Sequence, residues 1–379
     1  MFGDNRKIAL TPFPLFALGF RPFYLLAGGY AALSVAAWAL QYAGRLPGGD
    51  VLWHAHEMLF GYAFAVIAGF LLTAVRVWTG RPTPTGLPLA GIALLWVLSR
   101  SIAVFSLSAA AVMDMLFALA VAWGIGVPLI ASGDRRNWFF IALVLALGAA
   151  SLAFQAWPQL GVAIGLDVVL FVMAVMGGRV IPAFTNSAIP GAGARRQPLL
   201  EKASLGAVLL LLIVDAIGLP ENISGLIAVI AAALHAARLA LWAPLKTRGK
   251  PILWILHASY AWIVLHLALR GLAAFELVPA VVATHALTVG AIGGLTLGMM
   301  TRTARGHTAR PLDVGGAELA AYVLVQAAAV VRSLLPLAFP SAYGTMIALS
   351  ALLWSAAFAV FTAVYIPILT RPRLDGQPG

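Results

Sequence analysis

Residues 53–80 read WHAHEMLFGYAFAVIAGFLLTAVRVWTG. Between Glu57 and Arg76 the stretch carries no charge, and a helix needs about 20 mostly apolar residues to cross the hydrocarbon core of a bilayer. The stretch therefore predicts a membrane span over residues 52–78. The whole chain has the same character, since 62% of its 379 residues are hydrophobic and 10% are charged. Soluble domains carry about 25% charged residues, so a globular enzyme, a disordered chain and a disulfide scaffold are excluded.

Eleven further spans follow when each apolar run must be separated from the next by a polar, proline or glycine break. No soluble domain fits between them, so residues 1–379 are predicted to form a single all-α transmembrane domain. The twelve predicted spans cover residues 22–43, 52–78, 86–106, 109–131, 137–156, 161–183, 200–218, 222–243, 252–274, 278–300, 316–338 and 342–368.

Basic residues predict the orientation, because cytoplasmic loops retain Lys and Arg. The chain has 24 Lys and Arg against 13 Asp and Glu, a net charge of +11 that in a soluble protein would suggest a nucleic-acid partner. All but four of the basic residues fall on the side of the predicted bundle that holds both termini. We therefore expect both termini in the cytoplasm, the lipid bilayer as partner and no nucleic acid. The four exceptions are Arg45, Arg100, Arg270 and Arg332.

The second and tenth spans share residues at a constant offset of 229, which predicts a parallel internal repeat with units 15–85 and 245–315. The alternative is that span ends independently favour Arg, Gly and Pro. Glycines within both spans are expected to pack neighbouring helices rather than to bind phosphate. The identical pairs are His56/His285, Gly61/Gly290, Gly69/Gly298, Arg76/Arg305, Thr79/Thr308, Arg81/Arg310 and Pro82/Pro311.

The chain has no Cys, so a metal site must use imidazole, thioether or carboxylate ligands. Ionisable groups within spans are costly and are therefore candidates for function. Counted at about 1.5 Å per residue, the seven His form two layers. The outer layer comprises His54, His56, His266 and His285, with Asp114, Asp167 and Asp215 as carboxylates that would orient them; the inner layer comprises His235, His257 and His307.

His56 and His285 are the strongest candidates, because they are equivalent in the repeat and a six-coordinate haem iron needs two facing imidazoles. His54 lies two residues from His56, about 200° around a helix, so a regular helix cannot direct both at one ion. Arg76 and Arg305 are predicted to be cytoplasmic anchors, or contacts for propionates if a haem is present. For His235 and His266, hydrogen-bonded packing is an equally good expectation.

Four blocks resemble the NnrS family: residues 53–80, FRPFYLLAG from Phe20, GGRVIPAFT from Gly177 and HALTVGAIGGLTLGMMTRTARGHTARPL from His285. The resemblance covers nearly the whole chain. It departs at Ala309, where the family block reads GHTGR, and at Arg76-Val77, where Pro-Asn is common. The residues that the resemblance carries over from the family's motifs are His54, His56, Glu57, His257, His285, Arg302 and His307.

The resemblance implies a twelve-span bacterial inner-membrane protein with haem and copper, associated with nitric oxide metabolism, denitrification and resistance to nitrosative stress. Haem-ligating His on the second and tenth spans also describes the catalytic subunit of haem-copper oxidases, which suggests His56 and His285 as axial ligands. The sixth and seventh spans lack the His residues of an oxidase binuclear centre. The candidate cofactor or metal contacts are therefore His54, His56, His257, His266, His285, His307, Arg76 and Arg305.

Three functions fit this sequence. The first is a haem protein, with or without copper, that binds, converts or protects against nitric oxide and takes electrons from an unknown donor. The second is a secondary transporter with an intramembrane His and Asp pathway. The third is a haem-bearing regulatory or assembly partner of another complex. The sequence leaves open whether the protein is an enzyme.

Overall fold

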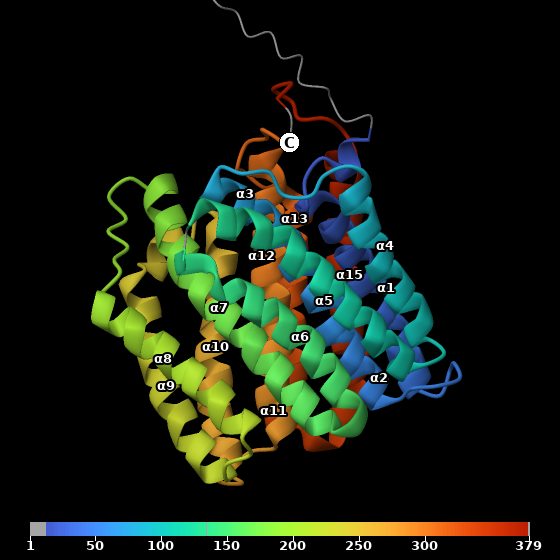
Figure 1. Cartoon of the computed structure of the whole chain (residues 1–379). Helices are drawn as coiled ribbons and strands as arrows, with labels where there is room; N and C mark the ends of the chain where they lie inside the picture. The colour runs from blue at the N-terminus through green and yellow to red at the C-terminus, as the bar shows by residue number, and fades with distance from the viewer. Residues whose placement is uncertain (1–12, 134, 378–379) are drawn as a thin grey trace, which may run out of the picture.

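The computed structural model describes residues 13–133 and 135–377, and within them it contains helices and no strands. The long helices run side by side between two ends (Figure 1). They are α1 (Phe20–Tyr42), α2 (Val51–His56), η2 (Glu57–Ala63), α3 (Phe64–Thr79), α4 (Leu87–Ala103), α5 (Leu107–Ser132), α6 (Phe139–Ala156), α7 (Pro158–Ala188), α8 (Pro198–Ala216), α9 (Glu221–Leu241), α10 (Pro251–Ala274), α11 (Ala280–His285), η5 (Ala286–Gly293), α12 (Gly294–His307), α13 (Gly316–Ser333), α14 (Leu335–Ala338) and α15 (Tyr343–Leu369). Single turns are η1 (Pro14–Phe16), η3 (Arg135–Asn137), η4 (Pro244–Thr247) and η6 (Pro340–Ala342).

Ten helical segments of the described chain are long and apolar enough to cross a membrane. The other two predicted spans correspond to α4, which is apolar but has 17 residues, and α8, which has 19 residues and carries Glu201, Lys202 and Asp215. Each predicted span thus matches one helical segment. The prediction of an all-α, polytopic membrane protein with about twelve spans is confirmed.

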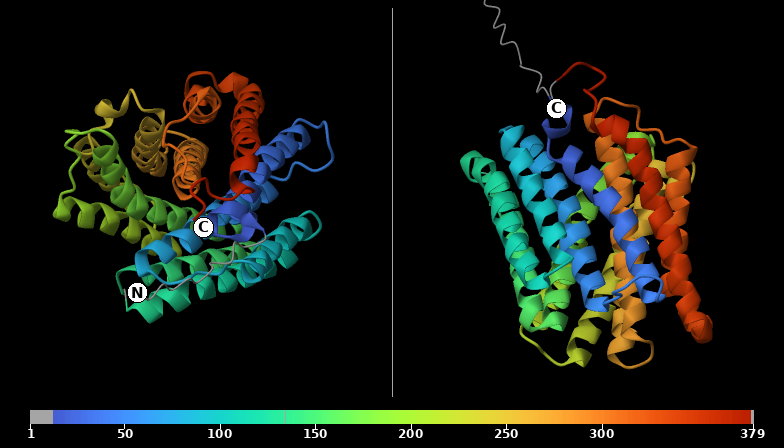
Figure 2. Two further views of the ribbon diagram at one scale, coloured as in Figure 1. Left: turned by 90° about the horizontal axis from the view of Figure 1, so that it is seen from above. Right: turned by 90° about the vertical axis from the view of Figure 1, so that its right-hand side faces the viewer.

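The two ends of the bundle differ in what they hold. One end, called the tail end below, carries the C-terminal segment 370–377 together with the last residues of α3 and α12 (Figures 1 and 2). Arg21 Nη1 donates to the carbonyls of Leu369 (3.0 Å) and Arg371 (2.7 Å) there, and Leu374 N donates to Thr308 O (3.2 Å). The opposite end carries α2 and α11. That the tail end is cytoplasmic stays a prediction.

The second span lies at the centre of the molecule. Of the most apolar window in Val51–Thr79, 89% is buried, whereas the corresponding share for Glu221–Leu241 is 33%. α3 packs against α1 and α5, and the tenth span packs against α10 and α13. An apolar helix at the edge presents its side chains to lipid, while one at the centre must fill every face with protein contacts. The second span can therefore position functional side chains against several neighbours.

The second and tenth spans have the same construction, which regular helix geometry does not predict. In each, a six-residue α-helix ending in His56 or His285 passes into a π-helical segment, η2 or η5, before the α-helix resumes. π-helical segments are rare and frequently occur at functional sites. Their first residues, Glu57 and Ala286, are separated by the same offset of 229 as the identical residues. The shared irregularity supports the predicted repeat, which stays a prediction.

Glycines of the two spans allow close helix packing, as predicted. A Cβ added to Gly69 would lie 2.7 Å from Phe23 Cβ of α1, and one added to Gly298 would lie 2.8 Å from Leu256 Cδ2 of α10. A Cβ at Gly290 would lie 2.4 Å from the Trp262 ring. Small residues that let two backbones approach are typical of membrane helix interfaces. These glycines are packing positions in the structure.

Two helices extend beyond their predicted ends. α7 continues through Pro182 to Ala188, although its predicted span ends at residue 183. The hydroxyl of Thr185 donates to the Ile181 carbonyl (2.9 Å) within this last part of the helix. α12 continues to His307, which was expected in the following loop. The polar residues after Met300 keep helical geometry beyond the apolar run, because a span need not end where its hydrophobicity ends.

Candidate functional site

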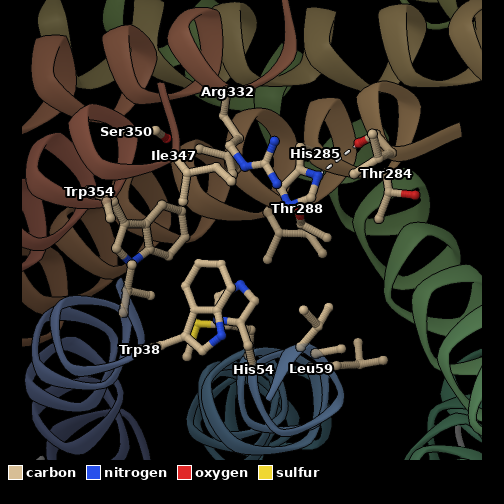
Figure 3. Close-up of a pocket in the computed structure, with 18 of the residues that line it drawn as sticks. Trp38, His54, Leu59, Thr284, His285, Thr288, Arg332, Ile347, Ser350 and Trp354 are labelled. Carbon is tan, nitrogen blue, oxygen red and sulfur yellow. Dashed lines mark hydrogen bonds between the residues drawn. The ribbon is translucent and has the colours of Figure 1, made fainter. Parts of the chain in front are cut away.

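A cavity of about 430 Å³ opens between the second and tenth spans at the end opposite the tail. Apolar and aromatic side chains from α1, η2, α7 and α15 form most of its wall. Cavities that hold small molecules and cofactors have this composition and volumes of about 300–1,000 Å³. Its polar or aromatic lining includes Trp38, His54, Thr284, Thr288, His285, Arg332, Tyr343, Ser350 and Trp354 (Figure 3).

His54 enters the cavity from α2. Its ring stacks on the indole of Trp38, with ring centroids 4.0 Å apart and an interplanar angle of 21°. The Nδ1 atom of His54 is buried and has no hydrogen-bond partner among the described residues. A buried polar atom without a partner is costly. The stacking holds the imidazole in place, while its Nδ1 is left without a hydrogen bond.

His285 enters the same cavity from α11, on the facing wall (Figure 3). Its Nδ1 lies 2.7 Å from the carbonyl oxygen of Val281. A carbonyl only accepts, so Nδ1 carries the proton and the neutral ring has its lone pair on Nε2. A metal-ligating His usually donates its other N–H to a carbonyl or carboxylate in this way. The local helix geometry thus prepares His285 to act as a ligand through Nε2.

Arg332 on α13 supplies the positive charge of this cavity. Its side chain is buried at 8% exposure, and Nη1 donates to the Tyr343 hydroxyl (3.1 Å). The guanidinium lies 5.1 Å from the centroid of the same ring. No carboxylate of the described chain pairs with it. A buried cation without a counter-ion is costly, so the cavity is electrostatically suited to a ligand with an anionic group.

His56 does not line this cavity but lies in a buried polar network between the second span, α4, α5 and α6. Its Nδ1 donates to Glu57 Oε1 (2.8 Å), and its Nε2 lies 3.1 Å from Ser151 Oγ. The Ser151 hydroxyl in turn donates to Asp114 Oδ2 (2.8 Å). Both nitrogens of His56 are therefore occupied by side-chain partners, which leaves neither of them open to a metal.

Arg100 balances the charges of this network. Nη1 donates to Glu57 (2.7 Å), and Nη2 donates to Asp114 and to Ser99 Oγ (2.7 Å). The Tyr30 hydroxyl also donates to Glu57. Arg100 thus pairs with two carboxylates in the protein interior, although its Nε has no hydrogen-bond partner among the described residues. Buried hydrogen-bonded networks of this kind typically rigidify a protein core.

The structure thus brings His54, not His56, together with His285. Side chains two positions apart on a helix point about 200° apart, so only one of His54 and His56 can face the tenth span. The repeat predicted that His56 would face His285, but His56 does not line the cavity that His285 enters. Asp114 contacts an imidazole, as expected of an orienting carboxylate, whereas Asp167 and Asp215 both pair with Arg270.

The remaining His lie apart from one another. His257 Nε2 lies 2.9 Å from Thr185 Oγ, and His266 Nδ1 donates to the Ala283 carbonyl (2.8 Å). His235 lies 2.6 Å from the Tyr260 hydroxyl and, with its other nitrogen, 3.2 Å from the Ser204 carbonyl. Within residues 13–133 and 135–377, no three His, Asp or Glu side chains are grouped so that they could hold a metal ion.

The arginines that the sequence suggested as propionate contacts lie at the other end. Arg305 pairs with Glu318 and donates to the Tyr365 hydroxyl (3.2 Å), and Arg76 lines a separate cavity at the tail end. Arg302 lies over the Phe184 ring at 3.8 Å. The arginine at the His54–His285 cavity is Arg332, which the sequence singled out only as one of four basic residues on that side. A basic residue on the side of the bundle that holds few of them is a signal that could have identified Arg332.

Comparison with protein families gives a match over most of the chain. The family model described as NnrS protein matches residues 14–373, which is nearly the whole chain. No curated protein matches the chain.

Proposed function

This chain belongs to the NnrS family, whose model covers residues 14–373, and from that premise we propose that it is a haem protein acting on nitric oxide in a bacterial inner membrane. Family membership suggests a role in nitric oxide metabolism or response. The haem, its ligands and the chemistry at the site are the proposal. Binding, conversion and protection of iron from the gas are the three forms that this role can take.

The observation that carries the proposal is the cavity with one imidazole on each facing wall. His54 and His285 would hold the iron, and the apolar wall would surround the macrocycle. When bound, the haem would supply an iron on which nitric oxide can be ligated or through which electrons can pass. Val281 fixes the tautomer of His285, whereas His54 is held only by stacking on Trp38. Of the two imidazoles, that of His54 is therefore the less firmly held.

Arg332 would hold an anionic group of the haem, since it faces the cavity without a carboxylate partner. We predict that Arg332→Gln lets haem leave the protein about tenfold faster, because a hydrogen bond to a charged group is worth about 1.5–3 kcal/mol. The rate of haem transfer to apomyoglobin measures this effect without any assay of activity. Arg45→Gln is the matched control, because Arg45 is an exposed arginine at the same end. Equal transfer rates for both variants would contradict the assignment.

Copper is part of the family resemblance, and here it stays a proposal without a site. The His, Asp and Glu side chains of the described chain form no three-residue cluster that could hold a metal ion. The structure therefore gives no reason to choose among His257, His266 and His307 as the copper ligand. Metal analysis of the purified protein gives the copper content. The ring of His257 has a buried Nδ1 without a partner among the described residues, so His257→Ala is the first variant to compare.

A secondary transporter is the alternative function, and one observation favours it. The hydrogen-bonded series from Tyr30 through Glu57, His56 and Ser151 to Asp114 is a buried run of ionisable and hydroxyl groups within the spans. Such runs occur in proton relays. Glu57 and Asp114 of this series both pair with Arg100, which suits a structural role better than a pathway that must change protonation.

The absorption spectrum of the purified protein, with metal analysis, separates the two functions. The haem proposal predicts a Soret band and about one haem per chain, with a spectral change when nitric oxide is added to the reduced protein. A colourless, metal-free and correctly folded preparation would overturn it and favour the transporter. A haem spectrum that does not respond to nitric oxide would retain the cofactor and reject direct ligation of the gas.

A further inference from the structure

A second cavity, of about 310 Å³, opens at the tail end between α1, α3, α12 and the C-terminal segment. Its lining includes Arg76, His307 and Arg373 and no acidic residue. It lies at the other end of the bundle from His54 and His285, so nothing in the proposed haem site accounts for it.

Positive charge accumulates at this cavity. Arg21, Arg76 and Arg373 all lie close enough to the His307 ring to interact with it electrostatically. The Arg76 side chain forms no ion pair or hydrogen bond with the described part of the chain, whereas its backbone carbonyl accepts from Gly80 N (3.0 Å). The nearby acidic group, Asp375, is exposed and receives two hydrogen bonds from Arg373 (2.9 and 2.7 Å), which lower its pKa to about 2. Like charges near a low-dielectric interior repel, and a bound anion would relieve that repulsion.

The walls of the cavity are formed by elements that contact one another rather than by open loops. Phe20 packs on the His307 ring, with ring centroids 5.6 Å apart, and Phe20 N donates to Thr73 Oγ (2.8 Å) on the cavity wall. The tail is held across the mouth by the bond from Leu374 N to Thr308 O (3.2 Å). These contacts join α1, α3, α12 and the tail. The basic side chains are therefore presented from fixed elements.

The tenth span provides an internal comparison. Arg305 occupies the position equivalent to Arg76, and it is neutralised by Glu318 of α13. α13 begins at residue 316 and α4 begins at residue 87, which is the same offset of 229. The position equivalent to Glu318 is therefore residue 89, which is a buried leucine. The protein thus supplies a carboxylate partner for Arg305, whereas the described chain supplies none for Arg76.

We propose that the cavity lined by Arg76, His307 and Arg373 binds a phosphate group. Guanidinium forks and imidazole N–H groups are the donors that match phosphate oxygens, and Arg is favoured where such recognition is planar and bidentate. The phosphate can come from the headgroup of an anionic membrane lipid or from a free phosphate ion. The site does not depend on the haem.

Thermal unfolding of the purified full-length protein in detergent tests the proposal with two probes. One arm adds sodium phosphate, compared with sodium chloride of equal ionic strength; the other adds phosphatidylglycerol, compared with a neutral lipid of equal chain length. A Tm that rises with phosphate but not with phosphatidylglycerol identifies a free phosphate ion as the ligand. A Tm that rises with phosphatidylglycerol, whether or not it also rises with phosphate, identifies the lipid headgroup. No rise in either arm would overturn the proposal.

Variants connect the effect to the cavity. Arg76→Gln and His307→Gln should each weaken binding of the effective probe by about tenfold, which corresponds to 1.4 kcal/mol. Arg248→Gln removes one charge from an exposed residue away from the cavity and should leave binding unchanged. Equal binding by all three variants would show general attraction to basic protein and overturn the assignment. Because the two variants lie on different helices, α3 and α12, His307→Gln serves if Arg76→Gln does not fold.

Discussion

Replacing Arg100 with methionine is expected to lower the free energy of unfolding by about 3–5 kcal/mol, because removing one partner of a buried ion pair leaves the others uncompensated. Arg100 is the shared partner of Glu57 and Asp114, and all three are buried. Its loss would leave two buried carboxylates without the cation that they share. Few single substitutions elsewhere in this chain would unbalance so many buried charges.

Denaturant or thermal unfolding of the purified variant measures this loss. Arg45→Met is the matched control, since it makes the same change at an exposed position and should alter stability by less than about 0.5 kcal/mol. The triple variant Arg100→Met, Glu57→Gln, Asp114→Asn should recover part of the loss, because it removes the charges that were left unpaired. An Arg100→Met variant as stable as the control would refute the assigned charge balance.

The second large effect concerns the cofactor. His54→Ala and His285→Ala are each expected to reduce the haem retained after purification by at least about tenfold, since even partners that only orient a metal ligand contribute about 10–100-fold. Each substitution removes an imidazole from one wall of the cavity and leaves the fold intact, because neither side chain makes a hydrogen bond to another side chain of the described chain. The pyridine haemochrome assay gives the ratio of haem to protein. Full haem content in both variants would place the haem elsewhere.

The helical organisation was predictable from the sequence because bilayer thickness dictates the length of an apolar run. All twelve predicted spans have a helical counterpart. The errors lie at helix ends, where α7 passes through Pro182 and α12 continues through polar residues to His307. Hydrophobicity locates the part of a helix that lies in lipid, but it does not report how far hydrogen bonding extends beyond.

The cavity was only half predictable. His285 was identified, but the choice between His54 and His56 depends on the direction in which a helix face points, and periodicity without known neighbours does not fix that direction. The partners of His56 are Glu57, which is adjacent, and Ser151 and Asp114, which are distant in sequence. Arg332 comes from another span altogether. Only the packed helices bring these residues together.

The most direct test of the account is the electron paramagnetic resonance spectrum of the oxidised haem in the wild-type protein and in three variants. The wild type and His56→Gln should give the low-spin signal of a haem with two imidazole ligands. His54→Ala and His285→Ala should each lose that signal. A wild-type signal in His54→Ala, together with its loss in His56→Gln, would contradict the central claim that His54 and His285 are the facing ligands.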